Sequence, residues 1–252
     1  MSAHNPTPKV ALVTGALGGI GSAICRTLLA ENYRIIALLS SGNGERERQW
    51  LQQEGFDASS IRFVVTDVNS HEAATEAINK ALDAEGRIDL LVNNAGITRD
   101  AQFKKMSFEQ WCAVLDTNLK SLFTITQPVF QRMLEQKSGR IVNITSVNGL
   151  KGQFGQANYS AAKAGMIGFT KALAAEGARS GVCVNAIAPG YTATPMVTAM
   201  RDDVVDSIKA QIPMQRLAEP AEIAAAVAYL ASDGAAYITG ETLSINGGLY
   251  MH

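Results

Sequence analysis

The sequence predicts an α/β fold in which one doubly wound sheet of seven parallel strands carries helices on both faces. Short apolar runs rich in β-branched residues alternate with longer amphipathic stretches. Such an alternation of strand and helix requires parallel pairing through right-handed crossovers. The strand-like runs are continuously apolar, which is typical of strands buried on both faces. At 252 residues and 47% hydrophobic content, the chain is long enough for one such sheet and its core.

Seven apolar runs are predicted as strands. In chain order they are residues 10–14, 34–39, 62–66, 90–92, 140–144, 182–186 and 242–245. The amphipathic stretches between them predict helices near residues 20–31, 44–54, 70–84, 107–136, 157–179, 197–210 and 220–231. Seven strands in this length leave no room for a second domain. We therefore expect a flexible leader over residues 1–8 and a single domain over residues 9–252.

Composition excludes several classes of function. Lysine plus arginine number 22 and aspartate plus glutamate 23, so a net charge of −1 gives no electrostatic footprint for nucleic acid or an anionic membrane. The three cysteines are widely spaced and fit reduced, packed thiols, and the three histidines lack ligand spacing, so no metal site is expected. Because the chain shows no signal peptide and no bilayer-spanning apolar run, we expect a soluble, cytoplasmic protein.

A glycine-rich turn joins the first predicted strand to the first predicted helix. It consists of Thr14-Gly15-Ala16-Leu17-Gly18-Gly19-Ile20-Gly21. Glycines here permit a tight turn and close approach of the backbone to a pyrophosphate, and a helix N-terminus offers free N–H groups and partial positive charge. A glycine turn alone is a weak signal, but between strand and helix of an alternating chain it predicts nucleotide binding. Its spacing is wider than that of the common dinucleotide fingerprint.

The residues after the second predicted strand favour NADPH over NADH. A site for NADH places an acid against the ribose hydroxyls, whereas here Ser40 follows the strand and no carboxylate comes before Glu45. The Ser40 hydroxyl and the Arg46 guanidinium suit a ribose 2′-phosphate. The alternative is that residues 45–48 form only a solvated helix face.

Three polar residues late in the chain predict proton transfer. Ser146 follows the fifth predicted strand, and Tyr159 and Lys163 lie four residues apart on one face of a predicted helix. A carbonyl that accepts a hydride develops negative charge on oxygen and needs a positioned proton donor. A free phenol has a pKa of about 10, and a neighbouring ammonium lowers it. We therefore expect Tyr159 to be the general acid, with its pKa lowered by Lys163, and Ser146 to hydrogen-bond the carbonyl oxygen.

Each of these motifs follows a predicted strand: the glycine turn follows the first, Asn93-Asn94-Ala95-Gly96 the fourth and Ser146 the fifth. With this order of motifs, the chain resembles short-chain dehydrogenases/reductases from about Lys9 onward. The resemblance implies a Rossmann-type fold and a homotetramer formed through the helices near 107–136 and 157–179. It also implies a catalytic tetrad made of Asn118, Ser146, Tyr159 and Lys163.

Within this tetrad, the resemblance gives Lys163 the further role of holding the nicotinamide ribose. Asn118 would hold a water that relays protons. The alternative for Asn118 is a polar residue at a helix bend.

Strand-end position and resemblance together give the residues expected to bind NADPH/NADP+. They are Gly15, Leu17, Gly18, Gly19, Ile20, Gly21, Ser40, Arg46, Asp67, Val68, Asn94, Ala95, Gly96, Ile97, Thr98, Tyr159, Lys163, Pro189, Gly190 and Thr194. Within this set, Asp67 and Val68 suit the adenine edge. The segment from Pro189 to Thr194 matches the part of the family that closes over the nicotinamide.

The stretch from Ser146 to Tyr159 and the ending 246–251 are similar to acetoacetyl-CoA reductases of the polyhydroxybutyrate pathway. Residues 94–100 are shared by carrier-protein and CoA-thioester reductases. Carrier-protein reductases tend to have arginine where this chain has Ala175, and its loss weakens a docking patch for an acidic carrier. The residues that this resemblance assigns to an acyl-CoA thioester substrate are Asp100, Ser146, Gln153, Phe154, Gly155, Gln156, Gly190, Tyr191 and Arg201.

The leading hypothesis is therefore NADPH-dependent reduction of acetoacetyl-CoA to (R)-3-hydroxybutyryl-CoA. The main alternative is a 3-oxoacyl-[acyl-carrier-protein] reductase of fatty-acid synthesis, in which case residues 153–156 would be an ordinary loop before a helix. A non-catalytic NADP-binding regulator predicts a degraded tetrad, and all four members are present here.

Overall fold

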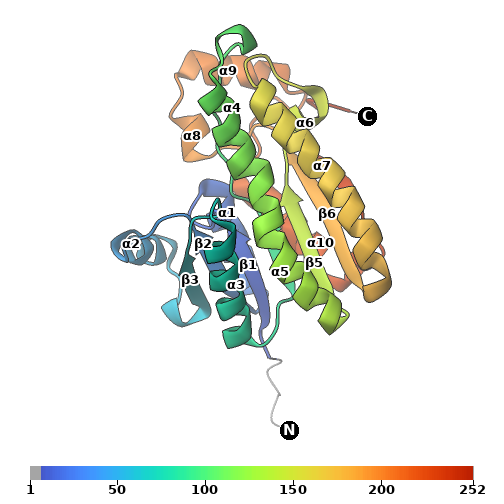
Figure 1. Ribbon diagram of the computed structural model, residues 1–252. Coiled ribbons are helices and arrows are strands. Elements are labelled where there is room, and N and C mark those ends of the chain that lie inside the picture. The colour runs from blue at the N-terminus through green and yellow to red at the C-terminus, as the bar shows by residue number, and fades with distance from the viewer. Residues whose placement is uncertain (1–6, 252) are drawn as a thin grey trace.

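The computed structural model describes residues 7–251, and its centre is one parallel sheet of seven strands (Figure 1). The strand order is β3-β2-β1-β4-β5-β6-β7. The chain thus builds outward from β1 in one direction and then returns to add β4 on its other side. This reversal between β1 and β4 is where open α/β sheets bind their ligands, outside the carboxyl ends of the strands. The predicted fold class is confirmed.

Each predicted strand is present, with bounds that shift by a few residues at most. The strands are β1 (Lys9–Thr14), β2 (Tyr33–Leu39), β3 (Ile61–Val65), β4 (Leu90–Asn93), β5 (Gly139–Ile144), β6 (Val182–Pro189) and β7 (Thr242–Ile245). The longest strand, β6, is buried at every position, and its one polar side chain, Asn185, is hydrogen-bonded to the backbone of Ile238 and Glu241. Of the predicted leader, residues 1–6 lie outside the described part of the chain.

Helices cover both faces of the sheet and bury two separate apolar clusters. On one face, α1 (Gly19–Ala30) packs against α10 (Pro220–Ala231), and α2 (Glu45–Glu54) adds the buried Trp50. On the other face, shown toward the viewer in Figure 1, lie α3 (His71–Glu85), α5 (Ser121–Gln136) and α7 (Ala157–Gly177). The Leu and Ile side chains beneath them are fully buried. This three-layer packing fixes the strand ends from which the polar residues project.

Two predicted helices are divided in the structure. The stretch predicted as a single helix at 107–136 consists of α4 (Phe108–Leu115), a π-helical turn η3 (Asp116–Lys120) and α5. The stretch predicted at 197–210 consists of α8 (Pro195–Thr198) and α9 (Asp202–Gln211). Arg201 between them has extended backbone angles, with φ −61° and ψ 145°, so the helix cannot run through it. A short helix, α6 (Val147–Lys151), was not predicted at all.

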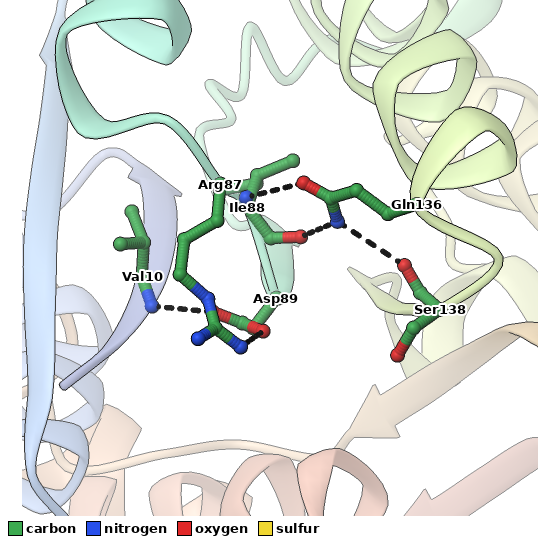
Figure 2. Close-up of polar contacts among 6 residues, drawn as sticks. All are labelled: Val10, Arg87, Ile88, Asp89, Gln136 and Ser138. Carbon is green, nitrogen blue, oxygen red and sulfur yellow. Dashed lines mark hydrogen bonds and ion pairs between the residues drawn. The ribbon is translucent and has the colours of Figure 1, made fainter. Parts of the chain in front are cut away.

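A hydrogen-bonded cluster, here called the clasp, lies at the amino ends of the central strands and consists of Val10, Arg87, Ile88, Asp89 and Gln136 (Figure 2). The Asp89 carboxylate accepts hydrogen bonds from the Val10 N–H at 2.8 Å and from the Arg87 guanidinium. The Gln136 amide accepts from the Ile88 N–H and donates to the Ile88 carbonyl. These contacts tie the start of β4 to β1 and to the end of α5. They lie at the edge of the sheet opposite to the predicted site.

The described part of the chain also bears on membrane-spanning helices, metal-ligand clusters and the cysteines. Within residues 7–251, no helix is long and apolar enough to cross a membrane, and no three His, Cys, Asp or Glu side chains gather as metal ligands would. Cys25, Cys112 and Cys183 are free thiols, as expected.

Candidate active site

The glycine turn between β1 and α1 has the geometry of a phosphate cradle. Gly15 adopts a left-handed conformation at φ +63°, and its carbonyl accepts a hydrogen bond from the Gly18 N–H at 3.1 Å. A Cβ on Gly21 would lie 2.1 Å from the Gly15 carbonyl oxygen, so only glycine lets the helix approach the turn so closely. No side chain caps the start of α1, which leaves its first N–H groups free for an anion. These residues fit the diphosphate of a dinucleotide.

The ends of β1 and β4 are locked together beside this turn. The Thr14 hydroxyl accepts hydrogen bonds from the N–H groups of Asn94 and Ala95, each at 2.9 Å. The Asn94 amide in turn donates to the carbonyls of Thr14 and Gly15. The structure thus brings two of the predicted cofactor segments into direct contact.

The segment after β6 lies against the glycine turn from the other side. A Cβ on Gly19 would lie 3.1 Å from atoms of both Thr194 and Pro195. Gly190 is equally confined, because a Cβ there would lie 2.9 Å from the Asn246 Cα. The segment from Pro189 to Thr194 therefore borders the glycine turn, and its closing role over the nicotinamide stays a prediction.

The loop after β2 differs from its prediction at one position. Ser40 and Arg46 are exposed, as residues that receive a phosphate from solvent should be, and the Asn43 side chain accepts from the N–H groups of Glu45 and Arg46. Glu47, however, is only 5% exposed, and its Oε2 atom has no hydrogen-bond partner among the described residues. The interpretation of residues 45–48 as a wholly solvated face is therefore wrong at Glu47, which packs toward Gly42 and Val65. Asp67 is exposed after β3 and caps the following turn at the Asn69 N–H.

Ser146 and Lys163 are held by backbone contacts at the carboxyl end of β5. Ser146 is the N-cap of α6, and its hydroxyl oxygen accepts a hydrogen bond from the Asn148 N–H at 3.1 Å. The Lys163 ammonium donates to the Ile144 carbonyl at 2.7 Å and is 5.7 Å from the centre of the Tyr159 ring. The Thr145 hydroxyl donates to the Lys163 carbonyl at 2.8 Å, which anchors α7 to β5. The structure thus brings together three of the four predicted catalytic residues.

Burial controls the proton affinities of Tyr159 and Lys163. Desolvation lowers the pKa of Lys163 from 10.5 to about 8. Desolvation also raises the pKa of Tyr159, the Asp100 charge adds to that rise, and a hydrogen bond with Ser146 opposes it. The expected lowering of the phenol pKa by Lys163 is therefore wrong for this state of the protein. Because the phenol stays protonated at neutral pH, Tyr159 is poised to give up a proton.

Asn118 occupies the π-helical turn and lies near Lys163, another of the predicted catalytic residues. Its amide accepts from the Ile97 N–H at 2.8 Å and donates to the Ile97 carbonyl at 2.9 Å. A Cβ on Gly96 would lie 3.4 Å from the Asn118 Oδ1 atom and 3.5 Å from the Lys163 ammonium, so these groups converge around Gly96. The alternative of a polar residue at a helix bend describes its surroundings correctly, and the water-holding role stays a prediction.

The structure brings together some of the predicted substrate residues and leaves others apart. Asp100 accepts a hydrogen bond from the Gln156 amide at 2.8 Å, and Ala101 N–H donates to the Gly155 carbonyl, so these two segments form one unit. The Asp100 charge also helps burial to raise the pKa of Tyr191.

The side chains of Gln153, Phe154 and Arg201 are exposed or paired with other residues, and their roles toward the substrate stay predictions. The Phe154 ring is 82% exposed and so does not wall a pocket in this state. Gln153 bonds the Lys151 ammonium, and Arg201 pairs with Asp203 in solvent. The Gln153 carbonyl accepts a hydrogen bond from the Gln156 N–H at 3.0 Å, so its backbone joins the unit that Asp100 forms with Gln156, while its side chain does not.

Sequence reasoning missed two buried asparagines that organise the site. Asn158 is fully buried, and its amide donates to the carbonyls of Arg99 and Gln110, which holds the loop that carries Asp100. Asn148 is 8% exposed and bonds Gln156. The available signal was an amide residue next to Tyr159 and another two residues after Ser146, because a buried amide is costly unless it is partnered.

Comparison with known proteins gives this architecture a family. The family model for short chain dehydrogenases matches residues 9–205. The chain belongs to the short chain dehydrogenase family.

This dehydrogenase is similar to curated relatives over nearly its whole length. It is 75% identical to an acetoacetyl-CoA reductase of Acinetobacter sp. (strain RA3849), over 97% of this chain and 98% of the relative. It is 49% identical to an acetoacetyl-CoA reductase of Cupriavidus necator, over 97% of this chain and 99% of the relative. It is 47% identical to a 3-oxoacyl-[acyl-carrier-protein] reductase of Salmonella typhimurium, over 96% of this chain and 98% of the relative.

Proposed function

We propose that this dehydrogenase reduces acetoacetyl-CoA to (R)-3-hydroxybutyryl-CoA with NADPH, and that it does so as a cytoplasmic homotetramer that supplies polyhydroxybutyrate synthesis. The observation that carries the choice of substrate is the 75% identity to an acetoacetyl-CoA reductase, against 47% to a carrier-protein reductase. The observation that carries the chemistry is the convergence of Ser146, Tyr159 and Lys163 at the carboxyl end of β5.

Each of these side chains has a distinct task in ketone reduction. A nicotinamide held at the glycine turn would supply the hydride. Tyr159 gives its proton to the carbonyl oxygen as negative charge develops there, and the Ser146 hydroxyl stabilises the same oxygen by a hydrogen bond. Lys163 keeps its ammonium next to the Tyr159 ring and so limits the cost of the phenolate that remains. Asn118 holds the Ile97 backbone and thus the loop that borders the cofactor.

The preference for NADPH rests on charge at the loop after β2. No acid directly follows the strand, and Ser40 and Arg46 are exposed where a 2′-phosphate would lie. We expect kcat/KM for NADPH to exceed that for NADH at least tenfold, since one charge-assisted pair contributes about 1.5–3 kcal/mol. Steady-state kinetics with both cofactors measure it, and equal values would contradict the preference.

The substrate is tested by comparing two thioesters of the same acyl group. We expect turnover of acetoacetyl-CoA to exceed that of the acetoacetyl carrier protein at equal concentrations. A strong preference for the carrier-protein thioester would replace the proposal with the fatty-acid reductase that the 47% relative represents.

The role of Tyr159 is tested by removing its hydroxyl alone. Tyr159→Phe should reduce kcat by about 10²–10⁴-fold, which is the usual contribution of a general acid. NADPH affinity, measured by fluorescence titration, should change less than twofold because the ring is kept. Retained reductase activity would remove Tyr159 from its role.

A further inference from the structure

A chain of hydrogen bonds runs from the exposed Asp100 to the catalytic Ser146. The Gln156 amide donates to the Asp100 carboxylate at 2.8 Å, and the Asn148 amide donates to the Gln156 carbonyl oxygen at 2.9 Å. The Asn148 backbone N–H then donates to the Ser146 hydroxyl oxygen at 3.1 Å. These three contacts join the loop after β4, the start of α7 and the start of α6.

Asp100, at the outer end, is firmly held. The Arg99 carbonyl beside it accepts from the buried Asn158 amide, and the Ala101 N–H on its other side donates to Gly155. The carboxylate therefore has a fixed position relative to Gln156.

The Asp100 carboxylate also fixes which way each amide faces. A carboxylate only accepts hydrogen bonds, so Gln156 must turn its NH₂ group to Asp100 and its oxygen to Asn148. Asn148 must then turn its NH₂ group to Gln156, and its own oxygen is left buried without a partner among the described residues. The unpartnered oxygen has an energetic cost that the chain tolerates, which indicates that the fixed orientation has a use.

We propose that Asp100, Gln156 and Asn148 form a positioning relay that aims the Ser146 hydroxyl. The Asn148 N–H occupies one lone pair of the Ser146 oxygen. The single hydroxyl proton of Ser146 therefore points away from Asn148, toward the Tyr159 phenol. When substrate is bound, its carbonyl oxygen takes the place of the phenol as the acceptor of this proton. None of the three relay residues transfers a proton itself. The relay rests on the proposed ketone reduction but makes no distinction between CoA and carrier-protein thioesters.

The relay is tested by exchanging the hydrogen-bond donor at Gln156 and the acceptor at Asp100, singly and together. Gln156→Glu puts a carboxylate against Asp100 and should lower kcat for acetoacetyl-CoA at least tenfold. Gln156→Leu breaks the same contacts without adding charge and should do the same. Adding Asp100→Asn to Gln156→Glu restores a donor facing an acceptor, so kcat should return to within threefold of the parent. Asp100→Asn should not rescue Gln156→Leu, because leucine offers nothing to bond.

Two further readouts separate positioning from folding and from substrate contact. NADPH affinity should stay near the parental value in every variant. Because Gln156→Leu leaves the buried Asn148 amide without its acceptor and lowers stability, kcat is measured well below each variant's melting temperature. Gln53→Glu, the same exchange on the exposed face of α2, should leave kcat unchanged. A rise in KM without a fall in kcat, or rescue of Gln156→Leu, would overturn the relay. A crystal structure of Gln156→Glu should show the Ser146–Asn148 contact broken, and an intact contact would also overturn it. This structural readout holds even if acetoacetyl-CoA proves not to be the substrate.

Discussion

At the scale of single residues, the burial of Lys163 makes stability depend on pH. Its pKa is about 8 in the folded protein against 10.5 for a free side chain. Between these values the unfolded chain binds more protons, so the contribution of Lys163 to the free energy of unfolding rises with pH. Below about pH 8 the buried charge costs the fold about 3 kcal/mol, and the cost disappears as pH approaches 10.5.

Comparison with Lys163→Met isolates this effect from other titrating groups. The variant's advantage in unfolding free energy should be largest at pH 7 and shrink steadily toward pH 10, as urea denaturation at each pH would measure. Comparison at each pH is needed because the pKa values of Cys25 and Tyr33 are raised to about 12, so these groups lower stability in the alkaline range of both proteins. A difference that does not vary with pH would contradict the depressed lysine pKa.

Glu47 offers a second prediction at this scale. Its buried oxygen has no partner among the described residues, and it lies in the helix that begins beside Ser40 and Arg46. Glu47→Gln keeps the shape and removes the charge, so we expect the free energy of unfolding to rise by about 1 kcal/mol and NADPH to bind more tightly. Glu45→Gln, on the exposed first turn, is the matched control. Equal effects of both variants on stability would show that burial is not the cause.

The sequence allowed the position of the proposed catalytic residues to be predicted, but not their electrostatics. The four-residue spacing of Tyr159 and Lys163 suffices to place both on one helical face, and the structure agrees. The pKa of Tyr159 depends on how much water reaches the phenol and on Asp100, which is 59 residues away in sequence, and no local pattern encodes either. The buried state of Glu47 was missed for the same reason.

At the scale of elements, the π-helical turn η3 is where sequence periodicity fails. Apolar spacing predicts one regular helix over 107–136, but the extra residue of a π turn leaves that spacing almost intact on either side. What selects the turn is tertiary, because Asn118 must reach both backbone groups of Ile97. The division of α8 from α9 likewise depends on the backbone at Arg201 rather than on apolar pattern.

Removing the Asn118 amide should therefore weaken both the fold and the chemistry. Asn118→Ala leaves the N–H and carbonyl of Ile97 without their partner, which costs about 1–3 kcal/mol of unfolding free energy. We also expect a fall in kcat larger than the change in KM, since the loop beside Gly96 and Lys163 loses its anchor. Lys120→Ala, on the same turn but exposed in an ion pair, should change stability by less than about 1 kcal/mol. Similar losses from both variants would argue against a special role for Asn118.

At the scale of the whole molecule, the sheet separates stability from catalysis. The alternation of strands and helices was enough to predict the parallel sheet, and the reversal of strand order between β1 and β4 places every proposed catalytic group at the carboxyl ends. The clasp at the amino ends (Figure 2) was not predicted, because Asp89 and Gln136 are 47 residues apart and belong to no local motif.

Because the clasp lies at the amino ends of the strands and the proposed catalytic residues lie at the carboxyl ends, we expect loss of clasp contacts to lower stability without lowering kcat. Asp89→Ala leaves the partly buried Val10 N–H without its acceptor and removes the partner of the half-exposed Arg87, so we expect a loss of about 1–3 kcal/mol in unfolding free energy. At temperatures well below the transition, kcat and NADPH affinity should stay within twofold of the parent, because the strands that carry the site remain paired on both sides. Asp83→Ala, which removes an exposed carboxylate paired with Arg132, should cost far less stability. Since the same assays follow both properties, a drop in kcat that parallels the loss of stability would show that the amino ends of the strands are mechanically coupled to the catalytic end.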